Sequence, residues 1–123
     1  MPDNTCPFCD KRNYDFIGDL AFTKTDSYPA SKGHTLVIPK RHISSYFDCT
    51  ENERLELWAL VEKAKGQLDR AYTPAGYNIG INIGEAAGQT VPHMHIHIIP
   101  RYSGDMDDPR GGVRGVIPER QKY

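Results

Sequence analysis

Three histidines alternate with apolar residues in the last third of the chain. His93, His95 and His97 occupy every second position of the stretch 89–101, which has the sequence QTVPHMHIHIIPR. Because a β-strand sends successive side chains to opposite faces, this spacing predicts three imidazoles on one face of a strand and three apolar side chains on the other. A helix would scatter the three histidines around its circumference, so the alternation favours a strand.

The chemistry of three neighbouring imidazoles leaves three interpretations open. The face is a histidine-rich polar surface, a three-histidine metal site, or a site for histidine chemistry on a phosphate or acyl group. A neutral imidazole, with an ordinary pKa near 6.5, is a nucleophile at neutral pH. Alternate strand positions lie about 6.5–7 Å apart, so a phosphate can contact two of them. Gln89, Thr90 and nearby backbone N–H groups can face the same anion, and we favour the phosphate or acyl interpretation.

Length and composition limit the class of protein. The 123 residues fit one domain over 1–123, and the formal net charge of −1 gives no electrostatic footprint for nonspecific nucleic-acid binding. No apolar run approaches the roughly 20 residues that span a bilayer, and the N-terminus has no apolar signal core. Three cysteines fit a reducing compartment better than a disulfide framework. We expect a cytoplasmic protein that binds neither nucleic acid nor membrane and carries no organic cofactor.

Short apolar runs and turn-forming residues predict an α+β domain with a mainly antiparallel sheet. The segment 1–13 is polar, and the tail 102–123 is rich in Gly, Pro and charge and therefore largely irregular. The run 35–38 predicts a strand buried on both faces. The segment 14–25 is expected to form two short strands, the second around 20–25, or one strand with a turn. Further strands are expected over 77–83, in the histidine stretch and, as a short one, near 113–117.

One long helix is predicted between the strands, from about residue 51 to residue 72. Thr50 and Glu53 match the capping-box pattern at its start. Pro74 and Gly76 follow its end. Between these ends, apolar residues recur every three or four positions and define one buried face. They are Leu57, Val61, Ala64, Leu68 and Ala71, flanked by Trp58 and Leu60.

Three sequence blocks resemble the histidine triad family. They are the stretch GQTVPHMHIHIIPR around the histidines, the block GHTLVIPKRH over 33–42, and Asn-Ile-Gly over 82–84. The flanking residues resemble the branch that contains fragile-histidine-triad-type diadenosine polyphosphate hydrolases, and the match covers nearly the whole chain in order. The resemblance implies a histidine triad fold: an antiparallel sheet of about five strands, one long helix and a short second helix or turn.

The resemblance implies catalytic roles residue by residue. His95 corresponds to the nucleophile that forms a nucleotidyl-imidazole intermediate. His97 corresponds to the residue that contacts the reacting phosphate and assists the leaving group. Gln89 corresponds to the residue that holds a phosphoryl oxygen and the departing group, and His34 to a member of the hydrogen-bond network that orients the nucleophile.

The same resemblance implies the residues that bind the nucleotide. Asp26 lies eight residues before His34, where family members carry an acidic or amide residue on the ribose hydroxyls. Asn82 and the hydroxyl of Thr90 correspond to residues near the α-phosphate. Together with Gln89 and His97 they form the predicted nucleotide site. Phe22 is either near the base or an ordinary core residue.

The third triad position indicates which reaction to expect. Nucleotidylyl transferases of this fold usually carry glutamine there, whereas this chain carries His97. The resemblance therefore implies a hydrolase in which water resolves the intermediate, with dinucleoside polyphosphates as the leading substrates and adenine as the expected base. The alternatives are a nucleoside phosphoramidase of the same family, a nucleotide-binding regulator with little turnover, and a three-histidine catalytic zinc enzyme.

Cys6 and Cys9 form a CxxC motif near the N-terminus. A redox motif would need a preceding strand, and a disulfide is disfavoured in a reducing compartment. Bacterial members of the resembled family use such a motif to hold structural zinc, with a histidine after the Pro-Lys pair and the first triad histidine. Here those positions are His42 and His93, so the resemblance implies a Cys6–Cys9–His42–His93 zinc site. The alternative is two unligated cysteines, with His93 bonded to the backbone; Cys49 is expected to be structural.

The resemblance also implies a homodimer with a continuous sheet. An edge strand that lacks proline and charge would permit such pairing, but the sequence does not identify the strand. Three tail arginines, Arg110, Arg114 and Arg120, either reach phosphate in the partner's site or remain solvated.

Overall fold

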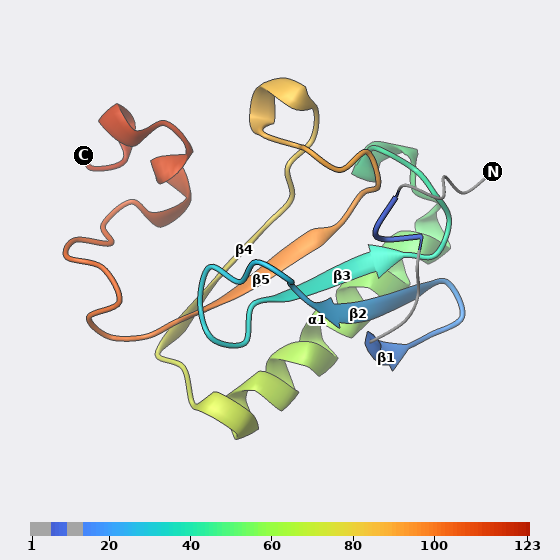
Figure 1. The fold of residues 1–123 in the computed structure, drawn as a ribbon, viewed down its shortest axis with the longest axis horizontal. Helices are drawn as coiled ribbons and strands as arrows, with labels where there is room; N and C mark the ends of the chain where they lie inside the picture. The colour runs from blue at the N-terminus through green and yellow to red at the C-terminus, as the bar shows by residue number, and fades with distance from the viewer. Residues whose placement is uncertain (1–5, 10–13) are drawn as a thin grey trace.

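Five antiparallel strands form one sheet in the order β1-β2-β3-β5-β4, with one long helix against it (Figure 1). This computed structural model describes residues 6–9 and 14–123, so most of the predicted N-terminal segment 1–13 lies outside the described residues. The predicted α+β class is confirmed. The elements are β1 (Tyr14–Ile17), β2 (Ala21–Thr25), β3 (Thr35–Pro39), α1 (Glu51–Tyr72), β4 (Gly76–Gly80) and β5 (Ile96–Arg101), with 3-10 turns η1 (Tyr46–Asp48), η2 (Glu85–Ala87), η3 (Gly112–Val116) and η4 (Pro118–Arg120).

Helix α1 begins and ends where the sequence predicts. The Thr50 hydroxyl accepts from the backbone N–H of Glu53 at 3.1 Å, and the Glu53 carboxylate accepts from the N–H of Thr50 at 2.8 Å. Thr73 ends the helix in the left-handed region, with φ of 50°. Leu57 and the three apolar positions that follow it on the same face are buried, as is Leu60. Ala71 was expected on this face, but it is exposed because the last turn extends past the sheet (Figure 1).

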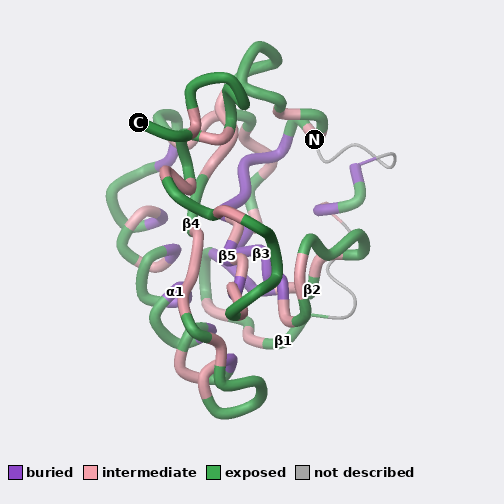
Figure 2. The backbone as a smooth tube through the Cα atoms, turned by 90° about the vertical axis from the view of Figure 1, so that its left-hand side faces the viewer, coloured by how far each residue is buried: buried purple, intermediate pink, exposed green. Residues whose placement is uncertain are grey.

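The sheet is covered on both faces, which Figure 2 shows as buried segments along its middle strands. One apolar cluster lies between the sheet and α1 and includes Val37, Leu57, Met94, Ile96 and Ile98. A second cluster lies on the opposite face and consists of Cys6, Phe8, Phe22, Leu36 and Ile38. Strand β3 contributes to both clusters, as expected for a strand buried on both faces. The second face therefore combines an apolar patch with the histidines of β5.

The histidine stretch keeps its alternation but is a regular strand only from Ile96 onward. The register between β3 and β5 would place Pro39 opposite Met94, and proline has no N–H to continue the ladder. The N–H of Met94 instead donates to the carbonyl oxygen of Ile43 at 2.7 Å. His93 and His95 therefore precede the strand, and His97 lies within it.

Two other strand predictions are corrected. Strand β4 ends at Gly80 instead of residue 83, because it pairs with β5 and β5 offers no regular strand before Ile96. The segment near 113–117 forms η3 instead of a strand. Local hydrogen bonds close its turns, including Arg114 N–H to Gly111 O at 2.9 Å, and satisfy the backbone without a partner strand.

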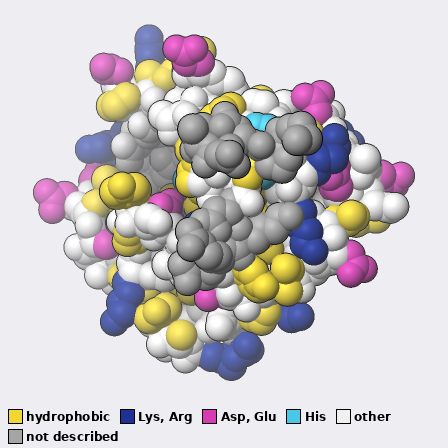
Figure 3. All heavy atoms as spheres, turned by 45° about the vertical axis from the view of Figure 1, so that its right-hand side comes forward, with side chains coloured by type: hydrophobic (Ala, Val, Ile, Leu, Met, Phe, Trp, Pro, Cys, Tyr) yellow, Lys and Arg dark blue, Asp and Glu magenta, His cyan; other side chains and the backbone are white. Residues whose placement is uncertain are grey.

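The surface carries charges of both signs. On the face drawn in Figure 3, Lys and Arg side chains lie among Asp and Glu side chains, and some histidine surface reaches the solvent. None of the described helices has the length and apolar character needed to cross a lipid bilayer. The tail after β5 ends far from residues 6–9 (Figure 1).

Candidate active site

A cavity of about 270 Å³ lies on the face of the sheet opposite α1. It brings together residues that are far apart in the sequence, from the ends of β2 and β5 and from the loop before the histidine stretch. Of the predicted site residues, the cavity is lined by Asp26, Asn82, Gln89, Thr90, His95 and His97. His34 contacts the same group from the start of β3.

His95 is held in one tautomer by the main chain. Its Nδ1 lies 2.9 Å from the carbonyl oxygen of His93. Because a carbonyl only accepts, Nδ1 must carry the proton, and Nε2 keeps its lone pair. Burial of His95, which is 8% exposed, lowers its pKa below the ordinary value, while the hydrogen bond to His93 opposes that shift. At neutral pH the imidazole is therefore neutral and its Nε2 can act as a nucleophile.

His34 and His97 form a hydrogen-bonded pair whose direction is also set by the backbone. The N–H of Ala30 donates to Nδ1 of His34 at 2.9 Å, so the His34 proton is on Nε2. That Nε2 lies 2.9 Å from Nδ1 of His97 and donates to it. The proton of neutral His97 is therefore on its Nε2, which makes that atom a hydrogen-bond donor. Asp26 faces the pair, with its Oδ2 3.4 Å from Nε2 of His34.

The two paired histidines are neutral at pH 7. Burial lowers the pKa of His97 to about 4, and the neighbouring His95 and His34 add to the shift, while Asp26 opposes it. Burial also lowers the pKa of His34, against the effect of Asp26. The pair therefore offers hydrogen bonds to a phosphate but no positive charge. Among the described residues that line the cavity, Lys24 is the only lysine or arginine.

Gln89 organises the loop that forms one wall of the cavity. Its Oε1 accepts from the N–H of Gly84 at 2.9 Å, and its Nε2 donates to the carbonyl oxygens of Ser44 and Val91 at 2.8 and 3.1 Å. Both N–H donors of its side-chain amide are therefore engaged by backbone carbonyl oxygens in this structure. A contact from Gln89 to a phosphoryl oxygen would have to replace one of these bonds.

The four predicted zinc ligands lie together beside the cavity. The ligand atoms of Cys6, Cys9, His42 and His93 all lie within 4.8 Å of one another. Cys6 Sγ to His93 Nδ1 is 3.5 Å, Cys9 Sγ to His93 Nδ1 is 3.6 Å, and Cys9 Sγ to His42 Nδ1 is 3.1 Å. Tetrahedral zinc with ordinary bond lengths separates its ligand atoms by about 3.3–3.8 Å, so the cluster fits a zinc ion after small adjustments.

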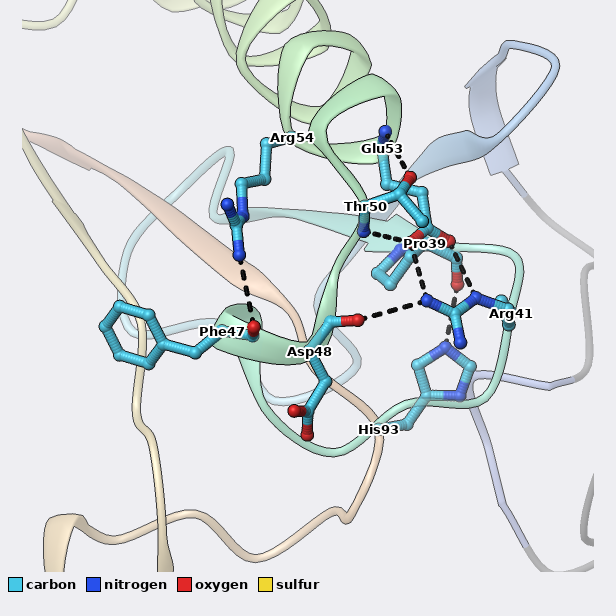
Figure 4. A network of polar contacts seen from close by, with 8 residues as sticks. All are labelled: Pro39, Arg41, Phe47, Asp48, Thr50, Glu53, Arg54 and His93. Carbon is cyan, nitrogen blue, oxygen red and sulfur yellow. Dashed lines mark hydrogen bonds and ion pairs between the residues drawn. The ribbon is translucent and has the colours of Figure 1, made fainter.

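The tautomer of His93 suits the same ion. Its Nε2 lies 2.7 Å from the carbonyl oxygen of Pro39 and must carry the proton (Figure 4). The Nδ1 lone pair therefore faces the two cysteines. Asp26, His34 and His97 are also close enough to be considered as metal ligands. His34 Nε2 carries a proton, however, and this argues against that second group. Neither group contains all three triad histidines, so the three-histidine metal site is not formed among the described residues.

An ion pair connects the segment that carries His42 to the start of α1. The Arg41 guanidinium donates to both carboxylate oxygens of Glu53, at 2.8 and 3.1 Å, and to the carbonyl oxygen of Asp48 at 3.2 Å (Figure 4). Glu53 is 4% exposed, and the hydrogen bond from Arg41 lowers its pKa. The same carboxylate thus accepts hydrogen bonds from the start of α1 and from Arg41, which precedes the candidate zinc ligand His42 in the sequence.

Sequence reasoning did not assign Phe8, Lys24 or Tyr28 to the site, although all three line the cavity. Phe8 had a usable signal, because it is an aromatic residue between two cysteines in an otherwise polar segment. Phe22 is fully buried in the second apolar cluster and does not line the cavity, so it is a core residue. Cys49 is buried in the helix-side cluster, as expected for a structural cysteine.

The tail arginines contact their own tail. Arg110 pairs with Asp108 at 2.9 Å, and Arg114 donates to the carbonyl oxygen of Arg120 at 3.1 Å.

A family model described as the HIT domain matches residues 16–104. The chain belongs to the HIT family. AP-4-A phosphorylase from Mycobacterium tuberculosis is 37% identical to this HIT protein over 89 residues, which cover 72% of the chain and 46% of that enzyme. The bifunctional bis(5'-adenosyl)-triphosphatase/adenylylsulfatase FHIT from Arabidopsis thaliana is 34% identical over 113 residues, which cover 92% of the chain and 62% of that enzyme.

A solved HIT structure has the same fold. The crystal structure of a Zn-bound histidine triad family protein from Mycobacterium smegmatis superposes with a TM-score of 0.74 at 31% identity, over 82% of this chain and 78% of that one. The predicted histidine triad fold is therefore confirmed. This HIT chain spans only 46% and 62% of the two enzymes named above.

Proposed function

We propose that this protein is a nucleotide hydrolase that cleaves dinucleoside polyphosphates at the α-phosphate through a nucleotidyl-histidine intermediate. The observation that carries the proposal is the pair of opposed histidine tautomers in the cavity. His95 offers an unprotonated Nε2, and His97 offers a protonated one. The names of the FHIT-type relatives support a dinucleoside polyphosphate substrate, with adenine as the expected base.

In the first step, Nε2 of His95 attacks the α-phosphorus, and the bond to the leaving polyphosphate oxygen breaks. The positive charge that develops on His95 is stabilised by the bond from its Nδ1–H to the carbonyl oxygen of His93. His97 donates a hydrogen bond from Nε2 to the departing oxygen. Because its pKa is about 4, His97 is neutral at pH 7. It therefore donates a hydrogen bond to the departing oxygen but does not transfer a full proton to it. A polyphosphate can leave as an anion with that help, whereas an amine needs a full proton.

In the second step, water attacks the phosphorus and the phosphorus–nitrogen bond breaks. The products are a nucleoside monophosphate, a proton and regenerated neutral His95. Asp26, Asn82 and Thr90 line the cavity, where they would hold the ribose and the α-phosphate. His34 acts on the reaction through His97, whose proton it places.

Phosphorolysis is a second candidate, because one relative is named AP-4-A phosphorylase. Orthophosphate would then replace water in the second step, and the product from the nucleotidyl group would be a nucleoside diphosphate. Lys24 is the basic residue best placed to attract that anion. The nucleoside phosphoramidase and the slow nucleotide-binding regulator use the same cavity and are separated from these by their substrates and rates.

One substrate panel tests these functions. Diadenosine triphosphate, diadenosine tetraphosphate and adenosine phosphoramidate are incubated with wild type and with His95→Asn, with and without orthophosphate. We expect wild type to release AMP from the dinucleotides faster than from the phosphoramidate, and the variant to lose about 10⁴-fold or more of that rate. Hydrolysis of diadenosine tetraphosphate gives AMP and ATP, whereas phosphorolysis gives ADP and ATP, so ADP that appears from this substrate only with orthophosphate would establish phosphorolysis. Undiminished turnover by His95→Asn would remove His95 as the nucleophile.

We also propose that Cys6, Cys9, His42 and His93 hold a structural zinc ion. Bound there, zinc would join the N-terminal segment to the sheet. Metal analysis of purified protein should find about one zinc per chain, retained in His95→Ala and lost in a Cys6→Ser, Cys9→Ser double variant. Zinc that survives the cysteine changes but is lost with His95→Ala and His97→Ala would contradict this assignment and restore the catalytic zinc alternative.

We propose, finally, a cytoplasmic homodimer. Strands β1 and β4 are the two edges of the sheet. Strand β4 contains neither proline nor a charged residue, and a cavity of about 810 Å³ lies beside it. This cavity is lined by β4, β5, the tail and the loop before β3, and it also reaches the site residues His34, Asn82 and His97. We propose that the β4 edge pairs with its copy and that the partner fills this space.

A further inference from the structure

Phe8 lies between the two candidate cysteine ligands in the sequence and against the proposed nucleophile in space. Its ring centroid is 4.7 Å from that of His95, with the rings at 71°. It is also 6.1 Å from the ring of His93, at 80°. Edge-to-face contacts of this kind are favourable for aromatic pairs. One side chain therefore touches both a candidate zinc ligand and the reacting imidazole.

Phe8 also forms part of the wall of the cavity. It lines the cavity of about 270 Å³ together with Pro7, on the side next to His95. Phe8 is 9% exposed and packs in the second apolar cluster with Phe22, Leu36 and Ile38. The position of this ring therefore determines the shape of the nucleotide site and how far the His95 ring is covered.

The segment that carries Phe8 contacts the rest of the molecule through its two cysteines and through apolar packing. Cys6 and Cys9 approach His93 and His42 at 3.1–3.6 Å, and the N–H of Cys9 bonds to the carbonyl oxygen of Cys6 at 3.2 Å. Phe8 and Cys6 also pack in the second apolar cluster, and Cys9 packs against it. A metal ion on Cys6 and Cys9 would fix the backbone on both sides of the ring.

We propose that Phe8 is a positioning residue that couples metal occupancy at the Cys6–Cys9–His42–His93 cluster to nucleotide affinity in the adjacent cavity. This inference rests on the proposed zinc site and nucleotide site and adds an energetic link between them. Zinc holds the ring against His95 and completes the cavity wall. Without zinc, the ring is released part of the time, and the nucleotide must restore its position when it binds.

Coupling of this kind is reciprocal. If zinc strengthens nucleotide binding by a given factor, the nucleotide must strengthen zinc binding by the same factor. We expect a factor of about 5 to 50, within the usual range for coupled sites. A zinc ion that only stabilises the fold would leave the two affinities independent in the folded protein.

The test measures both affinities on the whole chain. The dissociation constant of AMP is measured by calorimetry with and without zinc, and that of zinc by competition with a chromophoric chelator with and without AMP. Wild type should give the same factor in both measurements. Phe8→Ala should bring that factor close to one, and Phe8→Leu, which keeps most of the apolar volume, should retain part of it.

Phe22→Leu is the matched control. Phe22 is the same residue type in the same apolar cluster, but it lines neither the cavity nor the cysteine cluster. We expect its coupling factor to equal that of wild type, even if the variant is less stable. A similar loss of coupling in Phe22→Leu and Phe8→Ala would overturn the specific role of Phe8.

The remaining outcomes separate this inference from the proposals beneath it. Wild type that binds both AMP and zinc, with affinities that do not depend on each other, would overturn the coupling and leave both sites intact. Coupling that persists in Phe8→Ala would overturn Phe8 as the link. Failure of wild type to bind zinc would overturn the zinc site and the coupling, and failure to bind AMP would overturn the nucleotide site and the coupling.

Discussion

A histidine that is kept neutral by burial carries a cost that depends on pH. His97 has a pKa of about 4 in the folded protein, whereas an unfolded chain restores the ordinary value near 6.5. Between these two values the unfolded state binds a proton that the folded state does not. The free energy of unfolding must therefore fall as the pH is lowered from about 6.5 towards 4. His34 and His95 are shifted in the same direction and add to this effect.

The first prediction concerns this dependence. We expect the free energy of unfolding to decrease between pH 6.5 and pH 5, and His97→Asn to reduce the slope by up to about 1.4 kcal/mol per pH unit, the effect of one proton. Urea unfolding at several pH values measures both slopes. The comparison uses slopes, so a uniform loss of stability in the variant does not affect it. Equal slopes in the two proteins would show that His97 titrates normally.

The chemistry of single residues was only partly accessible from the sequence. The alternation of His93, His95 and His97 predicts that they share a face. It does not predict that His93 donates to a backbone carbonyl oxygen through Nε2, whereas His95 donates to one through Nδ1. Those carbonyl oxygens come from Pro39, at the end of β3, and from His93, in the turn before β5. Phe8 was missed because its importance comes from where the cysteines place it, which requires the tertiary contact to His95.

At the scale of elements, Glu53 joins two parts of the molecule. It caps α1, and it accepts two hydrogen bonds from Arg41, next to the candidate ligand His42. The side chain of Arg41 is 52% exposed, so the ion pair itself contributes modestly. The arrangement stabilises the fold mainly because one buried carboxylate accepts hydrogen bonds both from the N–H at the helix start and from Arg41 in the loop.

We expect Glu53→Ala to lower the free energy of unfolding by about 2 kcal/mol, because it removes the cap and the charged hydrogen bonds together. Glu51→Ala is the matched control, since Glu51 is an exposed acid in the same helical turn and should cost about 0.5 kcal/mol or less. Urea unfolding at neutral pH measures both. If the two losses are equal, the network of Figure 4 adds nothing beyond helix-end electrostatics.

The elements themselves were predictable to the extent that their signals are local. The capping box of Thr50 and Glu53 predicts the start of α1, and the apolar spacing predicts its buried face. The start of β5 could not be predicted, because it depends on Pro39 lying across from Met94, which is a matter of register. The end of β4 could not be predicted either, because β4 pairs with β5 and stops near the point where β5 begins.

At the scale of the whole molecule, the two edges of the sheet differ. Strand β1 carries Asp15, and β4 carries no charge and lies beside the larger cavity. Charged residues on an edge oppose pairing between copies, and an uncharged edge permits it. The exposed apolar residues of the tail, including Val113 and Val116, line that larger cavity and would be covered by a partner.

We expect wild type to be a dimer by size-exclusion chromatography with light scattering, and Ile79→Lys on β4 to be a monomer. Ile17→Lys on β1 is the matched control, because Ile17 is an exposed isoleucine on the opposite edge, and it should remain dimeric. The reverse pattern would assign the interface to β1. A monomeric wild type would remove the dimer proposal.

Main-chain groups determine which ring nitrogen of each site histidine carries the proton, and this limits which mutations can change the tautomers. The groups that fix the protons on His34, His93 and His95 are the N–H of Ala30 and the carbonyl oxygens of Pro39 and His93. A substitution changes a side chain and leaves these main-chain groups in place. Proline at position 30 is the exception, because it has no N–H to donate to His34. Insertions and deletions in the loop between β2 and β3 displace that N–H, so this loop should tolerate changes of residue far better than changes of length.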